Sequence, residues 1–186
     1  MLAVPLGIIA AIYISEIASP KLKTFFKNTI EILAGIPSVV YGFFGLTVLT
    51  SFLKNLFNQP SGVSWLAGSI ILGIMALPTI ISVSEDALAA IPYEYREASL
   101  GMGGTKWQTI TKIIVPAASP GISSAIILGM GRALGETMAV IMVCGNSAVI
   151  PTPITNVFSP IRTITSTLGQ EIPEIAAGST HYLVLS

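Results

Sequence analysis

Arg132 and Glu136 form a charged pair inside the long apolar run from Pro120 to Cys144. Arg132 lies roughly 24 Å along a helix beyond Pro116. A charged side chain at bilayer depth costs at least about 2.5–3.5 kcal/mol, so it must face a partner or a water-filled cavity. A guanidinium presents fork-like donors that match an oxyanion. The pattern therefore predicts an oxyanion path in which Arg132 binds the anion, Glu136 moderates the charge and Thr137 adds a hydroxyl.

The same spacing also permits a structural interpretation of the pair. Residues four apart lie one helical turn from each other, so Arg132 and Glu136 can neutralise each other as a local ion pair. Small residues recur every fourth position around them, at Gly121, Ala125, Gly129, Gly131, Gly135 and Ala139. Such ladders predict close packing between membrane helices.

The composition is that of a membrane protein. Of the 186 residues, 52% are apolar and 10% are charged, and the mean hydropathy is +0.80. Soluble domains carry about 25% charged residues. The net charge of zero gives no electrostatic case for nucleic acid as a partner. The single Cys144 has no disulfide partner in the chain and is expected to pack, and we expect one transmembrane domain, 1–186.

Four transmembrane helices are expected, over about 1–15, 29–52, 65–84 and 117–144, with kinks at Pro37 and Pro78. The first run spans only about 22 Å of a hydrocarbon core about 30 Å thick. No basic residue precedes it, so we expect the remainder of a spanning helix and not a signal peptide. Because 182–186 looks like the first turn of another span, both ends of the chain are expected to be cut.

A polar island over about 85–112 separates the third and fourth apolar runs. Pro92 and Glu94 are typical of a helix start. Gly101, Gly103 and Gly104 should break that helix before a second, basic run begins. The island is therefore predicted to form a protruding helical hairpin that a partner can bind.

The basic residues predict the orientation of the chain. Alternate loops place one set together, Lys21, Lys23, Lys27, Arg96, Lys106 and Lys112, and leave Lys54 and Arg162 on the other side. The positive-inside rule makes the side with the larger set cytoplasmic. The island then faces the cytoplasm, and 145–181, with a short amphipathic helix near Ile161 to Ala177, faces outward.

The sequence lacks the common catalytic motifs HExxH, CxxC and GxSxG, and His181 is the single histidine. The run from Gly103 to Lys106 lacks the spacing and context of a phosphate-binding loop. We therefore expect neither an enzyme nor a metal site, with ATP and Mg²⁺ bound by a separate subunit and no cofactor in this chain.

A spaced motif resembles the signature of ABC importer permeases, Glu-Ala-Ala-x3-Gly-x9-Ile-x-Leu-Pro. Here it reads Glu97, Ala98, Ser99, Gly103, Ile113, Val115 and Pro116. Ser99 and Val115 depart mildly from it. The resemblance implies an all-α polytopic membrane protein with a MetI-like core, whose last helix is missing here, and a cytoplasmic coupling helix in 97–116 that docks on the ATPase. Because Pro116 begins the segment that carries Arg132, movement of this loop is expected to reach the charged pair.

Two further segments, 34–42 and 131–139, look like phosphate importer permeases, more the PstC type than the PstA type. That resemblance implies ATP-driven phosphate import across a bacterial or archaeal plasma membrane. The implied partners are an ABC ATPase dimer, a second homologous permease, an external phosphate-binding protein and membrane lipid. Two alternatives stay open: an importer of another oxyanion, such as sulfate or molybdate, and a non-transport membrane scaffold.

Overall fold

The computed structural model describes residues 2–148 and 156–171, and over these residues the regular secondary structure is helical. The chain divides into two compact units, each made of two separate segments. Unit 1 comprises Met1–Gly35 and Gly73–Arg132, and unit 2 comprises Ile36–Leu72 and Ala133–Ser186. The single domain expected from the sequence stays a prediction.

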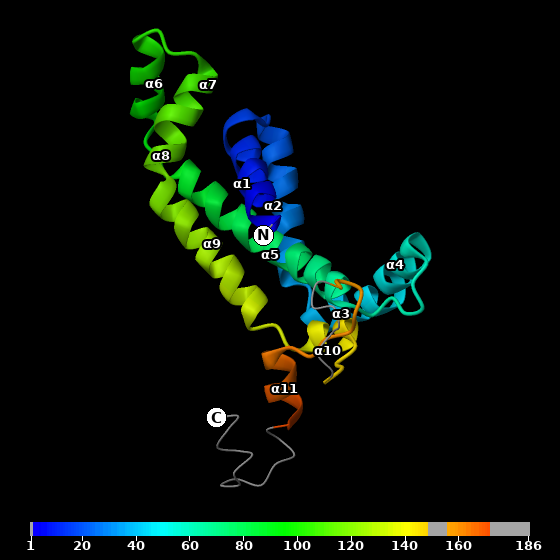
Figure 1. Cartoon of the computed structure of the whole chain (residues 1–186). Helices are drawn as coiled ribbons and strands as arrows, with labels where there is room; N and C mark the ends of the chain where they lie inside the picture. Colours follow the sequence, from blue (N-terminus) through cyan, green and yellow to red (C-terminus); the bar gives the residue numbers. More distant parts are fainter. Residues whose placement is uncertain (1, 149–155, 172–186) are drawn as a thin grey trace, which may run out of the picture. The chain divides into compact units, whose positions relative to one another are not determined.

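Unit 1 contains two helical hairpins and the helices that pack on them (Figure 1). Its elements are α1 (Ala3–Ile12), the π-helical turn η1 (Tyr13–Ile17), α2 (Pro20–Gly35), α5 (Trp65–Ala89) from Gly73 onward, α6 (Tyr93–Gly101), α7 (Lys106–Thr109), η3 (Ile110–Ile114), α8 (Val115–Ala117) and α9 (Ser119–Leu134) up to Arg132. Its core includes Ala11, Leu88, Ile114, Ala118 and Ile122. Unit 1 therefore contains the whole polar island.

The first small-residue ladder packs α9 closely on α5. A Cβ added to Gly121 would lie 2.4 Å from Cβ of Ala87, and one added to Gly129 would lie 2.4 Å from Cγ1 of Ile80. Ala125 between them is fully buried. Larger side chains would force these two helices apart, as the ladder predicted. Gly131 is different, because a Cβ there would meet nothing within 4 Å.

Unit 2 contains α3 (Ser38–Phe44), the π-helical turn η2 (Gly45–Leu49), α4 (Thr50–Phe57), the first turns of α5, α10 (Met138–Cys144) and α11 (Ile164–Glu171). Gly42 lies against Ala139, and Gly45 lies between Ile71 and Val143. Cys144 is a buried free thiol, with Gly68 beside its Sγ. It packs, as the sequence predicted.

Two helices among the described residues are long and apolar enough to cross a membrane, Ser38–Phe57 and Trp65–Ala89. A bent pair, Lys106–Ala117 with Ser119–Leu134, adds a third candidate span with an angle of 66° at its break, while Ala3–Ile17 is a shorter apolar helix. The chain is therefore a helical membrane protein. The third expected span, 65–84, corresponds to α5, which contains Pro78 and continues to Ala89.

The second expected span, 29–52, is divided where a kink was expected. α2 ends at Gly35, and the candidate span begins at Ser38. Pro37 occupies the N-cap position of α3, with φ −58° and ψ 141°. Proline has no N–H for the preceding turn and disfavours helical backbone in the residue before it, so the helix stops completely instead of bending.

The fourth expected span, 117–144, is not one helix either. α9 ends at Leu134 and α10 begins at Met138, so Gly135 to Thr137 lie outside regular helix. The amphipathic helix expected near 161–177 is found as α11, Ile164–Glu171. Residues 172–177 and the terminal segment 182–186 lie outside the described residues.

Candidate functional site

The coupling hairpin, defined here as Tyr93–Ile114, consists of α6, a glycine-rich turn, α7 and η3 (Figure 1). α6 begins after Pro92, has Glu94 in its first turn and ends at Gly101. Gly103 adopts φ +82°, a left-handed conformation that glycine accepts without steric cost. The amide of Gly104 donates to the carbonyl of Ser99 at 3.0 Å and closes the turn. The helix start and the glycine break are confirmed.

A reciprocal capping box restarts the helix after the turn. The amide of Thr105 donates to Oε1 of Gln108 at 2.9 Å, and the amide of Gln108 donates to Oγ1 of Thr105 at 3.3 Å. These two bonds satisfy amides that have no partner in the first turn of a helix. The second arm of the hairpin is therefore specified locally.

A buried hydroxyl pair links the two arms. Oγ of Ser99 lies 2.8 Å from Oγ1 of Thr109, and the two residues are 5% and 4% exposed. A Cβ on Gly104 would lie 2.8 Å from the carbonyl oxygen of Ser99, so the turn also needs this glycine. Ser99 is a departure from the permease signature, and here its hydroxyl has a definite partner. The sequence did not single out Thr109, since nothing in its spacing marks it.

The signature residues divide between an outward and an inward set. Glu97 and Ala98 are exposed on α6, and Pro116 is exposed on α8. Ser99 faces inward, while Ile113 is half-buried against the core of unit 1. Large apolar side chains on the same hairpin are also exposed, by 51% to 83%: Tyr93, Tyr95, Leu100, Met102 and Trp107. The roles of the signature residues in coupling stay predictions.

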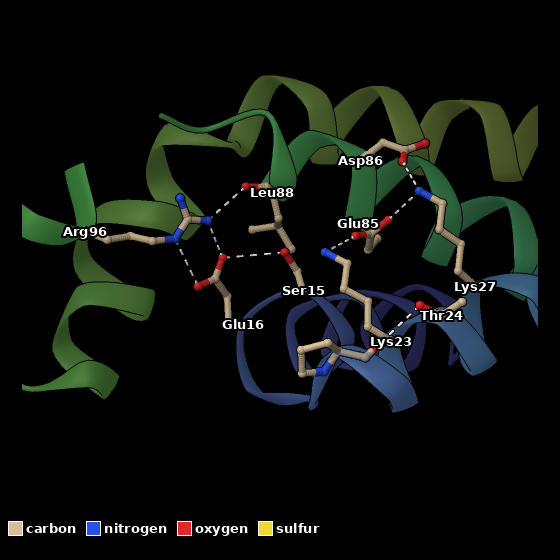
Figure 2. Close-up of polar contacts among 10 residues, drawn as sticks. Ser15, Glu16, Lys23, Thr24, Lys27, Glu85, Asp86, Leu88 and Arg96 are labelled. Carbon is tan, nitrogen blue, oxygen red and sulfur yellow. Dashed lines mark hydrogen bonds and ion pairs between the residues drawn. The ribbon is translucent and has the colours of Figure 1, made fainter. Parts of the chain in front are cut away.

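Arg96 fixes the base of the hairpin, as Figure 2 shows. Its Nη2 and Nε donate to Oε1 and Oε2 of Glu16 at 2.6 and 3.3 Å. Its Nη1 donates to the carbonyl of Ile91 at 2.8 Å, and Nη2 also donates to the carbonyl of Leu88 at 3.3 Å. This pairing was not predicted, because Glu16 and Arg96 are 80 positions apart in the sequence.

A second ion-pair cluster joins α2 to α5 (Figure 2). Lys23 and Lys27 contact the two oxygens of Glu85 at 2.7 and 3.1 Å, and Lys27 also binds Asp86 at 2.9 Å. The Glu85 side chain is only 4% exposed. Hydrogen bonds from Lys27 to Asp86 and Glu85 raise the pKa of the Lys27 amine above its ordinary value. Lys23, Lys27 and Arg96 are therefore each bound to an acidic partner within unit 1.

Arg132 binds two neutral oxygens within unit 1. Its Nη1 donates to Oγ1 of Thr79 at 3.2 Å, and its Nη2 donates to the carbonyl of Ala34 at 3.1 Å. That carbonyl lies in the last turn of α2, where Pro37 prevents the helix from continuing and leaves acceptors without helical partners. Among the described residues of unit 1, no acidic side chain forms an ion pair with Arg132.

Glu136 and Thr137 belong to unit 2 and have separate partners there. Oε1 of Glu136 accepts from the amide of Ala139 at 3.0 Å, which caps the start of α10. A negative charge at a helix N-terminus is stabilised by the helix dipole. Thr137 is the N-cap residue of α10, and its Cγ2 lies beside Gly169 of α11.

The prediction that Arg132 and Glu136 share one helix face is wrong. α9 ends at Leu134, between the two residues, so a spacing of four no longer corresponds to one helical turn. Each charged group instead stabilises a helix end, Arg132 that of α2 and Glu136 that of α10. The guanidinium keeps an uncompensated charge within unit 1 and N–H groups beyond the two in use, which is the chemistry that binds an oxyanion. Their role in a substrate path stays a prediction.

Comparison with known proteins identifies the family. Residues 3–184 match the model of the binding-protein-dependent transport system inner membrane component. The chain is 52% identical over 151 residues to a probable ABC transporter permease protein, YqgH, of Bacillus subtilis, covering 81% of this chain and 49% of that protein. It is 36% identical over 193 residues to the phosphate transport system permease protein PstC of Mesorhizobium japonicum, covering 94% and 58%.

A third relative has a similar degree of identity. The chain is 34% identical over 187 residues to a probable phosphate transport system permease protein PstC of Methanocaldococcus jannaschii, covering 92% of this chain and 58% of that protein. The chain thus spans about half to three fifths of the length of these curated relatives. The matched family is one of transport components and not of enzymes, in agreement with the expected absence of catalysis. This chain belongs to the family of binding-protein-dependent transport system inner membrane components.

Proposed function

We propose that this chain is the permease subunit of an ATP-driven importer that moves inorganic phosphate across a bacterial or archaeal plasma membrane. The observation that carries the proposal is the similarity to phosphate permeases of the PstC type, which extends over more than nine tenths of the chain at 34–36% identity. The relative from Bacillus subtilis is named without a substrate. Phosphate is therefore the first substrate to test, and another oxyanion is the second.

The coupling hairpin is the proposed contact with the ATPase. Its outward surface combines the exposed Glu97 with exposed aromatic and apolar side chains, including Tyr93, Met102 and Trp107. Aromatic residues and methionine are enriched in protein interfaces. ATP and Mg²⁺ would be bound by the ATPase dimer, and this chain would receive the movement that follows ATP binding.

Arg132 is the proposed anion contact in the substrate path. Its guanidinium is held by Thr79 and the carbonyl of Ala34, two acceptors that position the fork without cancelling its charge. A pre-positioned guanidinium binds an oxyanion through charge-assisted hydrogen bonds. Glu136 and Thr137, at the start of α10, would add a counter-charge and a hydroxyl to the path.

The remaining partners follow from the same proposal. A second homologous permease would complete the membrane pathway, and an external phosphate-binding protein would deliver the substrate on the side of 145–181. Lipid would cover apolar side chains that are exposed on the candidate span Ser38–Phe57, among them Val40, Phe43 and Phe52. The polar island would then face the cytoplasm.

The test is purification of the complex from membranes, followed by transport in proteoliposomes. The full-length permease should copurify with an ATPase and a second permease, and the reconstituted complex should accumulate labelled phosphate in an ATP-dependent manner. Accumulation of labelled sulfate or molybdate without phosphate would assign a different oxyanion. Absence of an ATPase from the purified complex would support a membrane scaffold instead.

A further inference from the structure

Arg96 brings three elements of unit 1 together at one point. Its backbone belongs to α6, and its guanidinium binds the carboxylate of Glu16 in η1. It also donates to the carbonyl of Leu88 in the last turn of α5 and to that of Ile91 in the linker that follows. Carbonyls at a helix C-terminus have no partners within their own helix, and a cation there complements the helix dipole. One side chain therefore satisfies the end of α5 and pairs with η1 simultaneously.

Burial makes this contact difficult to open. The Arg96 side chain is 18% exposed and that of Glu16 is 8% exposed. Separating them would leave a largely buried charge without compensation, which is strongly unfavourable. The fork geometry also requires a guanidinium, since an ammonium group cannot bind a carboxylate at two points and two carbonyls with the same orientation.

The connection between α5 and the coupling hairpin is short, and beside it the buried side chains of Ala11, Leu88 and Ile114 join α1, α5 and η3. Only Ala90, Ile91 and Pro92 separate the end of α5 from the start of α6. These apolar contacts are non-directional, whereas the hydrogen bonds of Arg96 fix the orientation of α6 relative to α5. With Arg96 in place, α6 is fastened to both α5 and η1 by side-chain hydrogen bonds (Figure 2).

We infer that Arg96 and Glu16 form a rigid joint through which the coupling hairpin, the end of α5 and the α1–η1 segment move as one body. Both are positioning residues, because they act on the transport cycle through the elements that they hold together. The inference rests on the proposed function, in which the hairpin receives its movement from the ATPase. It adds a polar contact of fixed orientation to the apolar packing of Ala11 and Ile114 through which the hairpin already meets α1.

Spin-label distances test the joint directly. Met102, 83% exposed at the tip of the hairpin, and Ile9, 64% exposed on α1, are replaced by cysteine and labelled, with Cys144→Ser removing the native thiol. In the assembled complex, the distance distribution between the labels should be the same with and without ATP bound. Glu16→Gln should broaden the distribution and make it respond to ATP. Arg96→Lys, which keeps the charge and loses the fork, should do so to a smaller extent.

Transport measurements provide the second readout. In proteoliposomes, Glu16→Gln should lower the number of phosphate ions imported per ATP hydrolysed by about tenfold or more, a typical size for a lost coupling between sites. The complex should still assemble. Asp86→Asn is the matched control, since it removes a paired carboxylate on α5 that binds Lys27 and not the hairpin, and it should leave both readouts unchanged.

Two results would overturn the joint. The first is a distance between the labels that changes with ATP in the protein that keeps Arg96 and Glu16. The second is a Glu16→Gln variant whose distance distribution and ratio of phosphate imported to ATP hydrolysed equal those of the protein with Glu16. Failure of the proposed function would give a different result from failure of the joint. If the complex imports no phosphate or contains no ATPase, the label distribution in the full-length permease alone still tests the joint. Glu16→Gln must broaden that distribution there as well.

Discussion

The tip of the coupling hairpin, from Ser99 to Thr109, and the surroundings of Arg132 depend on contacts of very different reach. In the hairpin, Ser99 and Thr109 are 10 positions apart, and the capping box closes within three. Arg132 binds Thr79 and Ala34, which are 53 and 98 positions away. Short-range contacts form early and at a low entropic cost, whereas contacts between distant residues require the helices to be packed first.

The difference separates two kinds of consequence. A substitution at the tip of the hairpin should change the local structure, or the surface proposed to contact an ATPase, and leave the packed helices intact. A substitution of Arg132 should act on α2, α5 and α9 together, because its side chain joins residues from all three. Variants of the hairpin and of Arg132 therefore test whether the effects of the first are local and those of the second extend over several helices.

The largest effect is expected for Arg132→Gln. Glutamine can still hydrogen-bond to Thr79 or the Ala34 carbonyl, but it has no charge for an anion, so labelled phosphate uptake into proteoliposomes should be abolished while the complex still copurifies. Arg132→Lys is the control that keeps the charge without the fork, and it should retain part of the uptake. Loss of the assembled complex in Arg132→Gln would instead assign Arg132 a purely structural role as the cap of α2.

The next largest effect is expected for Glu97→Lys and Gly103→Asp, which alter the outward surface of the hairpin. Glu97 is exposed, and a Cβ on Gly103 would meet nothing within 4 Å. The left-handed φ of +82° adds backbone strain of roughly 1–2 kcal/mol for any side chain at position 103, a cost that the control variant shares. ATP hydrolysis should continue while phosphate uptake falls about tenfold or more. Gly103→Asn is the control, since asparagine accepts the left-handed backbone without adding a charge. Normal uptake in both variants would remove the coupling assignment.

A smaller, local effect is expected for Ser99→Ala. It removes one buried hydrogen bond to Thr109, which keeps its bond to the Thr105 carbonyl, and should destabilise the hairpin by about 0.5–1.5 kcal/mol. Hydrogen exchange of the hairpin amides should accelerate by roughly two- to tenfold, with no change in helices α2 and α9. Thr111→Ala, which removes an exposed hydroxyl bonded to the Trp107 carbonyl, is the matched control. Equal acceleration in both variants would contradict the special role of the Ser99–Thr109 pair.

The smallest effect is expected for pH. The pKa of Lys27 is raised in the folded state, so its pairing with Asp86 and Glu85 contributes fully below the unfolded pKa of about 10.4 and is lost only as pH rises through the higher folded value. Lys27 should therefore add no pH dependence to thermal stability between about pH 6 and 9. A loss of stability in that window that disappears in Lys27→Gln would show that the pairing is weaker than the distances indicate.

Sequence reasoning was most accurate where the structure is local. The helix start near Glu94 and the break around Gly103 follow from backbone preferences of the residues themselves. The fourth span was predicted as continuous because its apolar character does not change at Gly135, whereas the interruption depends on Glu136 capping a new helix. The role of Pro37 was underestimated in the same way: it stops α2 and leaves a carbonyl that a distant arginine binds.

The pairing of Arg96 with Glu16 illustrates what a single sequence does not contain. Both residues are polar neighbours of apolar runs, and Arg96 entered the prediction only as one charge in a cytoplasmic loop. Their contact depends on how η1, α5 and α6 meet in space. No periodicity links positions so far apart.

The discontinuous composition of unit 1 has a consequence for biosynthesis. Met1–Gly35 leaves the ribosome before Gly73–Arg132, with a segment of unit 2 between them. At a synthesis rate of roughly 5–20 residues per second, α1 and α2 exist for several seconds before α5 and α6 are made. During that interval Glu16, Lys23 and Lys27 lack Arg96, Glu85 and Asp86, and their charges must be kept in water or in the membrane surface. The contacts that hold α1 and α2 in unit 1 are therefore complete only when α5 and α6 have been made, so these ion pairs serve assembly as well as the finished structure.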